Sequence, residues 1–336
     1  MATPHLIEDD TVVICENDPQ SYKLFAGSST VIRAWAVTIR GANSTPGQDV
    51  TIVADSITFE PGSSIVTDGA LGTPDWQPGL QPQTPDAPGS NGLAGGPGGD
   101  GQNAGGITLI AREIDGTVAV SAVGGRAGRG QDGGNGRRGA DYTGPIPSLI
   151  LVRDASSLPN PLQQGSPGQT GGTGGPAGPP GNEGNGGNLN IHAGNVSAIN
   201  VQANLSGGSG TPTATPGSPN VGGKGGPGPT YEYLVPSHRG QGPFAVTLVV
   251  AATGPDGASP SGSAPPAAAI AVVGLTPTPN LIQLTDDDFA QNCSIEQMRK
   301  ALATAELDYQ NDDLANALPR LAWVSAVAAR MPRPNN

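Results

Sequence analysis

The chain has 336 residues, of which 53 are glycine and 34 are proline, while aromatic residues make up only 4%. With 35% hydrophobic residues and so few large ones, the composition excludes a large side-chain core, so backbone hydrogen bonds must hold much of the fold together. The formal net charge of −12 at pH 7 argues against nucleic acids and anionic membrane surfaces as partners. No apolar run is long enough to span a bilayer, so we expect no membrane insertion.

The N-terminus and the cysteines are the two sequence features that could indicate whether the protein is secreted. The first residues, MATPHLIEDDTVVICE, lack a basic region followed by a hydrophobic one, so no secretory signal is visible. Cys15 and Cys293 are the only cysteines, which excludes a disulfide framework and leaves open one bridge or two free thiols.

A strand-like pattern, apolar-x-apolar-x-Ala-x-x-apolar, occurs three times along the chain, at residues 50–57, 107–114 and 189–196. A second alternating stretch follows each copy, at residues 64–67, 117–122 and 199–205. Alternation with period two predicts strands with one buried face. Weaker copies lie at residues 37–39 and 246–248. A repeated strand pair buries its apolar face against neighbouring copies, which predicts stacking as a β-solenoid with degenerate end copies.

Glycine recurs at every third residue in separate blocks between these strands. The blocks are residues 92–101, 130–139, 165–174, 178–187 and 222–228. A period of three is typical of a polyproline-II-type helix, and glycine on one edge lets neighbouring chains touch, so we predict a packed bundle of polyglycine-II helices. Phase slips at Gly125 and Gly128 argue against collagen, which needs an unbroken register. Disorder is the remaining alternative, and the similar block lengths favour order.

Aromatic residues occur in turn-rich segments at the ends of the glycine-rich excursions. Trp76, Tyr142, Tyr231 and Tyr233 lie close to Asp or Glu. A flat apolar face beside hydrogen-bond acceptors is typical of glycan-binding surfaces. The alternative is that these side chains cap the open ends of a core that lacks large residues.

Positive charge is concentrated in one block, at Arg126, Arg129, Arg137 and Arg138. These guanidinium groups are suited to binding a carboxylate or phosphate group. The alternative, which we favour, is that they neutralise neighbouring acidic segments or a neighbouring subunit.

The C-terminal part differs in kind from the rest. Residues 254–293 are predicted to form an Ala/Pro-rich linker and edge segment, and residues 294–331 a helical hairpin. Ser294 and Gln297 form a capping box, and Asp313 caps the second helix. Two short helices bury too little surface alone, so we expect the hairpin to dock elsewhere and to serve assembly. The residues assigned to these contacts are Leu302, Tyr309, Leu321 and Trp323.

The sequence shows no motif for a catalytic group, a metal site or a bound cofactor. His5, His192 and His238 have no carboxylate or cysteine partner at ligand spacing. Gly128-x-Gly130-x-x-Gly133 matches the dinucleotide fingerprint, but no helix follows it. The sequence therefore predicts a protein that is not an enzyme.

The strand copies resemble the parallel β-helix scaffolds of haemagglutinin-type bacterial adhesins. The glycine triplets resemble the polyglycine sandwiches of antifreeze proteins and of some tailed-phage adhesins, and the hairpin resembles one tetratricopeptide unit. The resemblance of the glycine-rich part covers residues 30–255 and rests on periodicity. It implies an extracellular, cell-surface or virion location, and the missing signal leaves open a removed signal, another export route or a protein that remains inside.

The predicted fold is mainly β, a β-solenoid with packed polyglycine-II excursions and a small C-terminal helical hairpin. The predicted divisions are an N-terminal β cap (1–46), the glycine-rich domain (47–253), the linker (254–293) and the hairpin (294–331). We expect a non-enzymatic structural protein that self-associates into a filament or larger extracellular particle. An adhesin that binds a receptor or surface glycan through aromatic loop tips is the alternative, and an ice-binding protein is a second alternative.

Overall fold

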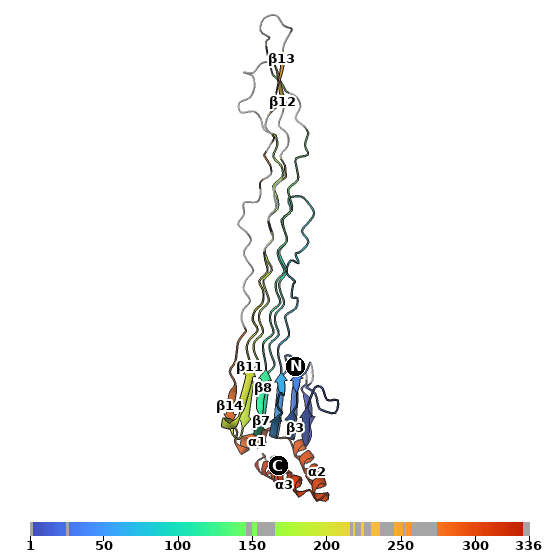
Figure 1. Cartoon of the computed structure of the whole chain (residues 1–336), viewed down its shortest axis with the longest axis vertical. Coiled ribbons are helices and arrows are strands. Elements are labelled where there is room, and N and C mark those ends of the chain that lie inside the picture. The colour runs from blue at the N-terminus through green and yellow to red at the C-terminus, as the bar shows by residue number, and fades with distance from the viewer. Residues whose placement is uncertain are drawn as a thin grey trace, which may run out of the picture.

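The computed structural model describes residues 3–24, 27–145, 150–152, 165–215, 218, 223–224, 230–235, 245–250, 253, 255–256, 258 and 274–331. Strands and helices gather at one end of the molecule, which we call the base (Figure 1). A long, narrow bundle of extended chain, which we call the stem, rises from the base and carries β12 and β13 at its far end.

The larger sheet of the base has seven strands, all paired in parallel. Its order is β1-β3-β5-β7-β10-β14, with β2 also beside β3. The strands are β1 (His5–Glu8), β2 (Thr11–Ile14), β3 (Thr30–Ile39), β5 (Val50–Phe59), β7 (Ile107–Asp115), β10 (Leu189–Ala193) and β14 (Asn280–Gln283). The three sequence copies lie side by side in register, because Val50 pairs with Ile107 and Ile107 pairs with Leu189.

The smaller sheet of the base has four parallel strands in the order β11-β8-β6-β4. They are β4 (Ala42–Ser44), β6 (Ser64–Val66), β8 (Thr117–Ser121) and β11 (Asn200–Asn204), with a short 3-10 helix at Val196–Ala198. At the far end of the stem, β12 (Thr230–Val235) pairs in parallel with β9 (Ile150–Val152) and antiparallel with β13 (Ala245–Val250).

The two sheets of the base enclose one core of Val, Ile, Leu and Ala side chains. Ile52 and Leu109 of the larger sheet and Ile65 and Val118 of the smaller one are fully buried in the same cluster. These residues occupy alternate positions on their strands, so the period-two pattern places them on one face.

Three helices cover part of the other face of the larger sheet: α1 (Asp286–Asn292), α2 (Ile295–Gln310) and α3 (Leu314–Arg330). Val53 and Ile110 point away from the first core and pack with Phe289 and Trp323 of the helices. Strands β5 and β7 are therefore buried on both faces around Val53 and Ile110. The predicted capping box of Ser294 and Gln297 starts α2.

The fold class expected from the sequence, a mainly β solenoid with polyglycine-II excursions, is wrong. The chain is an α/β fold with two sheets of parallel strands and a C-terminal helical region, at 25% strand and 17% helix. Periodicity showed which strand faces turn inward, but it did not show that helices far along the chain bury the opposite face. The predicted divisions of the chain stay predictions, and β14 and α1 lie within the segment expected to be a linker.

Candidate functional site

The stem consists of extended segments joined by backbone hydrogen bonds between residues far apart in sequence. Every third N–H of residues 92–101 donates to the segment that begins near residue 173, in the pairs Gly92–Thr173, Gly95–Pro176, Gly98–Pro179 and Gly101–Asn182 at 2.8–2.9 Å. On another side the N–H groups of Gly125 and Gly128 donate to Gln102 and Gly99. The backbone groups that a helix or sheet would satisfy are thus bonded between segments.

The glycines of the stem face the backbone of neighbouring segments. A Cβ built on Gly95 would lie 2.0 Å from the carbonyl oxygen of Gln131, and one on Gly98 would lie 2.0 Å from that of Gly128. Real Cβ atoms do not approach a carbonyl oxygen so closely, so any side chain there would push the segments apart. The glycine spacing therefore sets the distance between neighbouring segments.

Asparagine and aspartate side chains add a second set of bridges, which the sequence analysis missed. In each bridge a side-chain oxygen of one segment accepts from a backbone N–H of the next, at 2.7–2.9 Å. The pairs are Asn91–Thr173, Asp100–Asn182, Asn103–Asn185, Asp132–Thr215, Asn135–Ser218 and Asp141–Lys224. Four of these residues directly precede a triplet glycine, a signal that was present in the sequence.

The most buried charged group of the stem is the pair of Arg129 and Asp132. Their side chains are 5% and 4% exposed and lie 2.5 Å apart. Asp132 also accepts from the N–H groups of Gly79 and Thr215. Burial opposes ionisation of Asp132, but these hydrogen bonds and the guanidinium of Arg129 outweigh it and lower its pKa to about 2. The pair joins three segments.

The other arginines named from the sequence are also paired with carboxylates. Arg126 lies 2.9 Å from Asp75, Arg137 lies 2.7 Å from Asp86 and Arg138 lies 2.6 Å from Asp141. The last two pairs are largely exposed, so they contribute little to stability. These guanidinium groups are engaged with carboxylates of the same chain.

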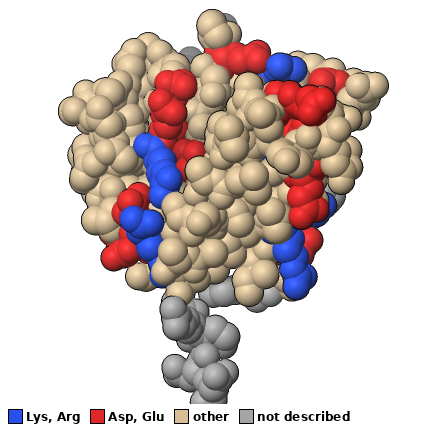
Figure 2. Space-filling view, turned by 90° about the horizontal axis from the view of Figure 1, so that it is seen from below, with Lys and Arg blue, Asp and Glu red and all other residues tan. Residues whose placement is uncertain are grey.

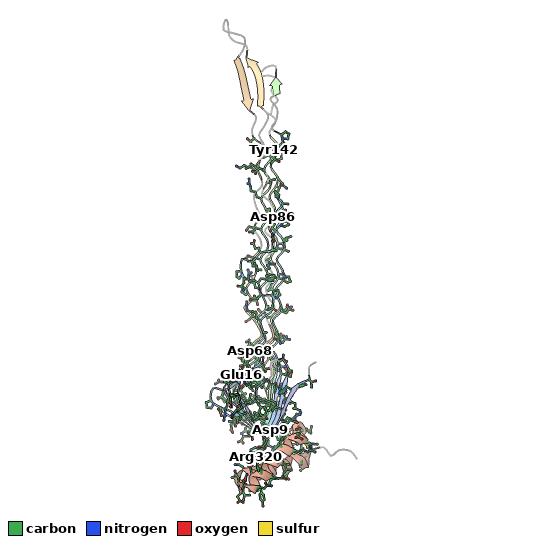
Figure 3. All side chains as sticks on the ribbon, turned by 90° about the vertical axis from the view of Figure 1, so that its right-hand side faces the viewer. Asp9, Glu16, Asp68, Asp86, Tyr142 and Arg320 are labelled. Atoms are coloured by element: carbon green, nitrogen blue, oxygen red, sulfur yellow. The ribbon has the colours of Figure 1, made fainter. Side chains whose placement is uncertain are left out.

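The aromatic residues named from the sequence lie at different levels of the stem. Trp76 is half-buried, and its indole N–H donates to the carbonyl of Pro97. The backbone N–H of Trp76 donates to the carbonyl of Arg129, whereas that of Tyr142 donates to the carbonyl of Lys224 near the far end (Figure 3). Thirteen residues of extended chain, about 40 Å, separate Arg129 from Tyr142. Trp76 and Tyr142 therefore do not share one surface, and the side chains of Tyr231 and Tyr233 lie outside the described part.

A buried ion pair fastens the helices to the base. Arg320 of α3 donates to both carboxylate oxygens of Asp10 at 3.1 Å, and it lies 3.0 Å from Asp308 of α2. Its guanidinium also stacks on the ring of Trp35, 4.2 Å from the ring centre. Arg320 is 8% exposed and Asp10 is 7% exposed, so this contact replaces water on both charges.

Gln297 of α2 makes a second polar contact with the base. It is fully buried, and its amide donates to the backbone carbonyls of Ala34 on β3 and Val53 on β5. Trp35, Asp55 and Arg112 occupy equivalent positions on the neighbouring strands β3, β5 and β7. The regular pairing of these strands is interrupted at this one position. Gln297 of α2 therefore docks next to this irregularity in the strand pairing.

The hairpin residues named from the sequence divide into two groups. Trp323 is 3% exposed and packs beside Val53 and Ile110, and Leu321 is half-buried. Leu302 and Tyr309 are 37% and 63% exposed. The hairpin contacts the base through one face and leaves apolar side chains on another.

Two ionisable groups under the helices have shifted pKa values. Burial raises the pKa of Asp55 to about 6, against the lowering effect of Arg112. Burial also raises the pKa of the Cys293 thiol to about 12, so it is not a thiolate nucleophile at neutral pH. Cys15 and Cys293 are both free thiols.

Within the described residues, no cluster of three or more His, Cys, Asp or Glu is arranged to hold a metal ion. None of the helices in the described part has the length and apolar character needed to cross a membrane.

Comparisons with known protein families, with curated proteins and with solved structures found no match to this chain. The resemblances to adhesins and to a tetratricopeptide unit are therefore corrected, since no relative supports them and the structure is an α/β fold in which three helices cover a parallel sheet. The expectations of an adhesin and of a filament are corrected on the same grounds.

Proposed function

We propose that this chain is a non-enzymatic structural protein that assembles with copies of itself. In this proposal the base makes the contacts between subunits, and the stem holds the far end of the chain away from the base. The observation that carries the proposal is the close approach of the stem segments, in which backbone carbonyls occupy the space where glycine Cβ atoms would lie.

The stem is suited to a mechanical role because it is bonded across its width. A segment is bonded to more than one neighbour: Gly95 donates to Pro176 of one neighbour, and Gln102 of the same segment accepts from Gly125 of another. The buried pair of Arg129 and Asp132 adds a link that water does not reach. A bundle joined in this way resists bending better than a single extended chain.

The chemistry of the described residues supports a non-enzymatic role. The arginines of the stem are engaged with carboxylates of the same chain. An open groove of about 500 Å³ is lined by residues such as Glu60, Ser64 and Gln202, which do not form a nucleophile and base pair. The charged and polar side chains serve structure.

Exposed apolar side chains on the helices support self-assembly. Ile295, Leu307, Tyr309 and Leu318 are 57–63% exposed in a chain that has few large apolar residues. Water contact with such side chains is unfavourable, and a second subunit would remove it.

Negative-stain electron microscopy and light scattering on the purified full chain test the proposal. We expect particles with narrow projections and a mass that is a multiple of 33.4 kDa. A compact monomer at every concentration would contradict it.

A further inference from the structure

The contact between the helices and the larger sheet leaves several polar groups without partners. Six buried side-chain nitrogen or oxygen atoms have no hydrogen-bond partner among the described residues, and five of them belong to this contact. They are Arg33 Nε, Trp35 Nε1, Asp55 Oδ1, Arg112 Nε and Trp323 Nε1. Because buried polar groups in folded proteins are nearly all hydrogen-bonded, this contact is held less completely than the rest of the base.

One guanidinium in the contact lies between two carboxylates. Arg112 of β7 lies 3.1 Å from Asp286 of α1, whereas its Nε lies 3.7 Å from Asp55 of β5, beyond hydrogen-bonding distance. Asp286 also lies 3.1 Å from Arg330 of α3. The helix carboxylate thus has two close cations, while the sheet carboxylate has a more distant one and a buried oxygen with no hydrogen bond from a described residue.

The other charged and titratable groups around Asp55 do not make up for this. Arg33 of β3 is engaged with Glu8, 3.5 Å away. Glu113 of β7 carries a like charge, and the thiol of Cys293, at the end of α1, is buried and un-ionised. An ionised Asp55 therefore meets mostly like charge or uncharged groups under the helices.

The charges at the surface of the base are arranged differently. Viewed from below, Lys and Arg side chains lie beside Asp and Glu side chains in bands at the sides of the base, with uncharged residues between the bands (Figure 2). The side chain of Asp55 is only 27% exposed. A groove of about 420 Å³ bordered by Asp55, Arg112 and Asn195 leads to it, so protons can reach the carboxyl group while the helices are docked.

We propose that protonation of Asp55 tightens the docking of the helical region (α1 to α3) on the larger sheet, and that its ionisation favours opening of this contact. Opening lets water solvate the ionised carboxylate and separates it from Asp286 on the helix side. A protonated carboxyl group has no charge to solvate and does not repel Asp286, so the closed contact then costs less. This device lies within one chain and does not depend on the proposed self-assembly.

The titration of Asp55 gives the direction and the pH range. Burial raises the pKa of Asp55 to about 6. Arg112 opposes this rise, and the carboxylates of Glu113 and Asp286 add to it. The closed form thus binds the proton more tightly than the open form, whose carboxyl group titrates near its ordinary value of 3.8. The stabilisation is fully present below about pH 4 and is lost as the pH rises through 6, so opening should become about 5- to 50-fold more frequent between pH 4 and pH 7.

Thiol labelling of Cys293 measures the opening. Cys293 is 8% exposed and packs in one cluster with Val53 and Ile110 of the sheet, so a thiol reagent reaches it when the contact opens. We use the full-length Cys15→Ser protein and dithiodipyridine as the probe. Each rate is divided by the rate for the denatured chain at the same pH, which removes the effect of pH on the thiol itself. The normalised rate is expected to rise about 5- to 50-fold from pH 4 to pH 7.

Two further variants assign the effect to Asp55. Asp55→Asn keeps the shape of the side chain but cannot ionise, so its normalised rate is expected to stay low from pH 4 to pH 7. Asp115→Asn, which removes an exposed carboxylate on the same strand as Arg112, is the matched control and should rise as the wild type does. A wild-type rate that stays constant or falls as the pH rises, or a rise that persists in Asp55→Asn, would overturn the proposal.

Discussion

At the residue scale, adjacent glycines of the stem have different surroundings. A Cβ on Gly95 would lie 2.0 Å from the carbonyl oxygen of Gln131, but one on Gly96 would meet nothing nearer than 3.4 Å. Both residues have ordinary backbone angles, so alanine strains neither by its conformation. The difference between them is therefore one of space alone.

Gly95→Ala is expected to destabilise the folded chain by about 1–3 kcal/mol, because the new methyl group forces two bonded segments apart. Gly96→Ala is the matched control and should change the free energy of unfolding little. Chemical denaturation of both variants measures the difference. Equal stability of the two would show that the segments are not packed as described.

Asp132 should contribute to stability in a pH-dependent way. Its pKa in the folded chain is about 2, below its ordinary value, so the contribution is fully present above about pH 4 and is lost as the pH falls towards 2. Asp132→Asn is expected to cost at least about 2 kcal/mol at pH 7, since it also leaves Arg129 buried without its partner.

Unfolding of the Asp132→Asn variant between pH 7 and pH 2 tests this contribution. The stability of the variant should fall less steeply below pH 4 than that of the wild type. Asp86→Asn is the control, because Asp86 forms an ion pair with Arg137 while 86% exposed, and it should leave the stability unchanged. Parallel pH profiles for wild type and Asp132→Asn would contradict the assignment.

At the element scale, the sequence predicted the strand copies and their pairing better than it predicted what covers them. The alanines at positions 54, 111 and 193 mark equivalent places, and they align in the larger sheet. The adjacent apolar pairs Ile52-Val53 and Leu109-Ile110 indicate burial on both faces, but the alternation on either side of them obscured that signal. Helices 170 or more residues away along the chain provide the second cover.

The bridges of the stem show a similar limit. The Asx-Gly dipeptides were visible at Asn91, Asp100, Asp132 and Asn135. Their partners are 82 or 83 residues away, close to the 82-residue spacing of the strand copies at 107–114 and 189–196. The dipeptide alone defines a residue's position within its own segment, whereas the neighbouring segment follows from the spacing of the repeated strands.

Arg320 should hold α3 to the base. Arg320→Ala is expected to destabilise the helical region by about 3–5 kcal/mol, because it leaves Asp10 buried without a counter-charge. Helical circular dichroism during denaturation measures the effect. Arg299→Ala is the control, since Arg299 is 73% exposed and lies 3.6 Å from Glu296. Equal loss in both variants, or loss in neither, would contradict the role of Arg320.

At the scale of the whole molecule, the base and the stem are held together by different kinds of interaction. The base excludes water with Val, Ile and Leu between two sheets and beneath the helices. The stem contains few apolar residues, so backbone hydrogen bonds and close packing at glycine replace side-chain burial there. A composition that excludes a large core is thus consistent with an ordered, elongated protein.

The elongated shape gives the last prediction. A compact chain of 336 residues would have a radius of gyration of about 20 Å, and the same chain unfolded would have one of about 65 Å. The stem extends far beyond the base (Figure 1), so small-angle X-ray scattering of dilute full-length protein should give an intermediate value and a distance distribution with a long tail. A value near 20 Å would mean that the stem folds back on the base. A value near 65 Å with no change on adding denaturant would mean that the whole chain, the stem included, is unfolded, and either result would remove the structural basis of the proposed function.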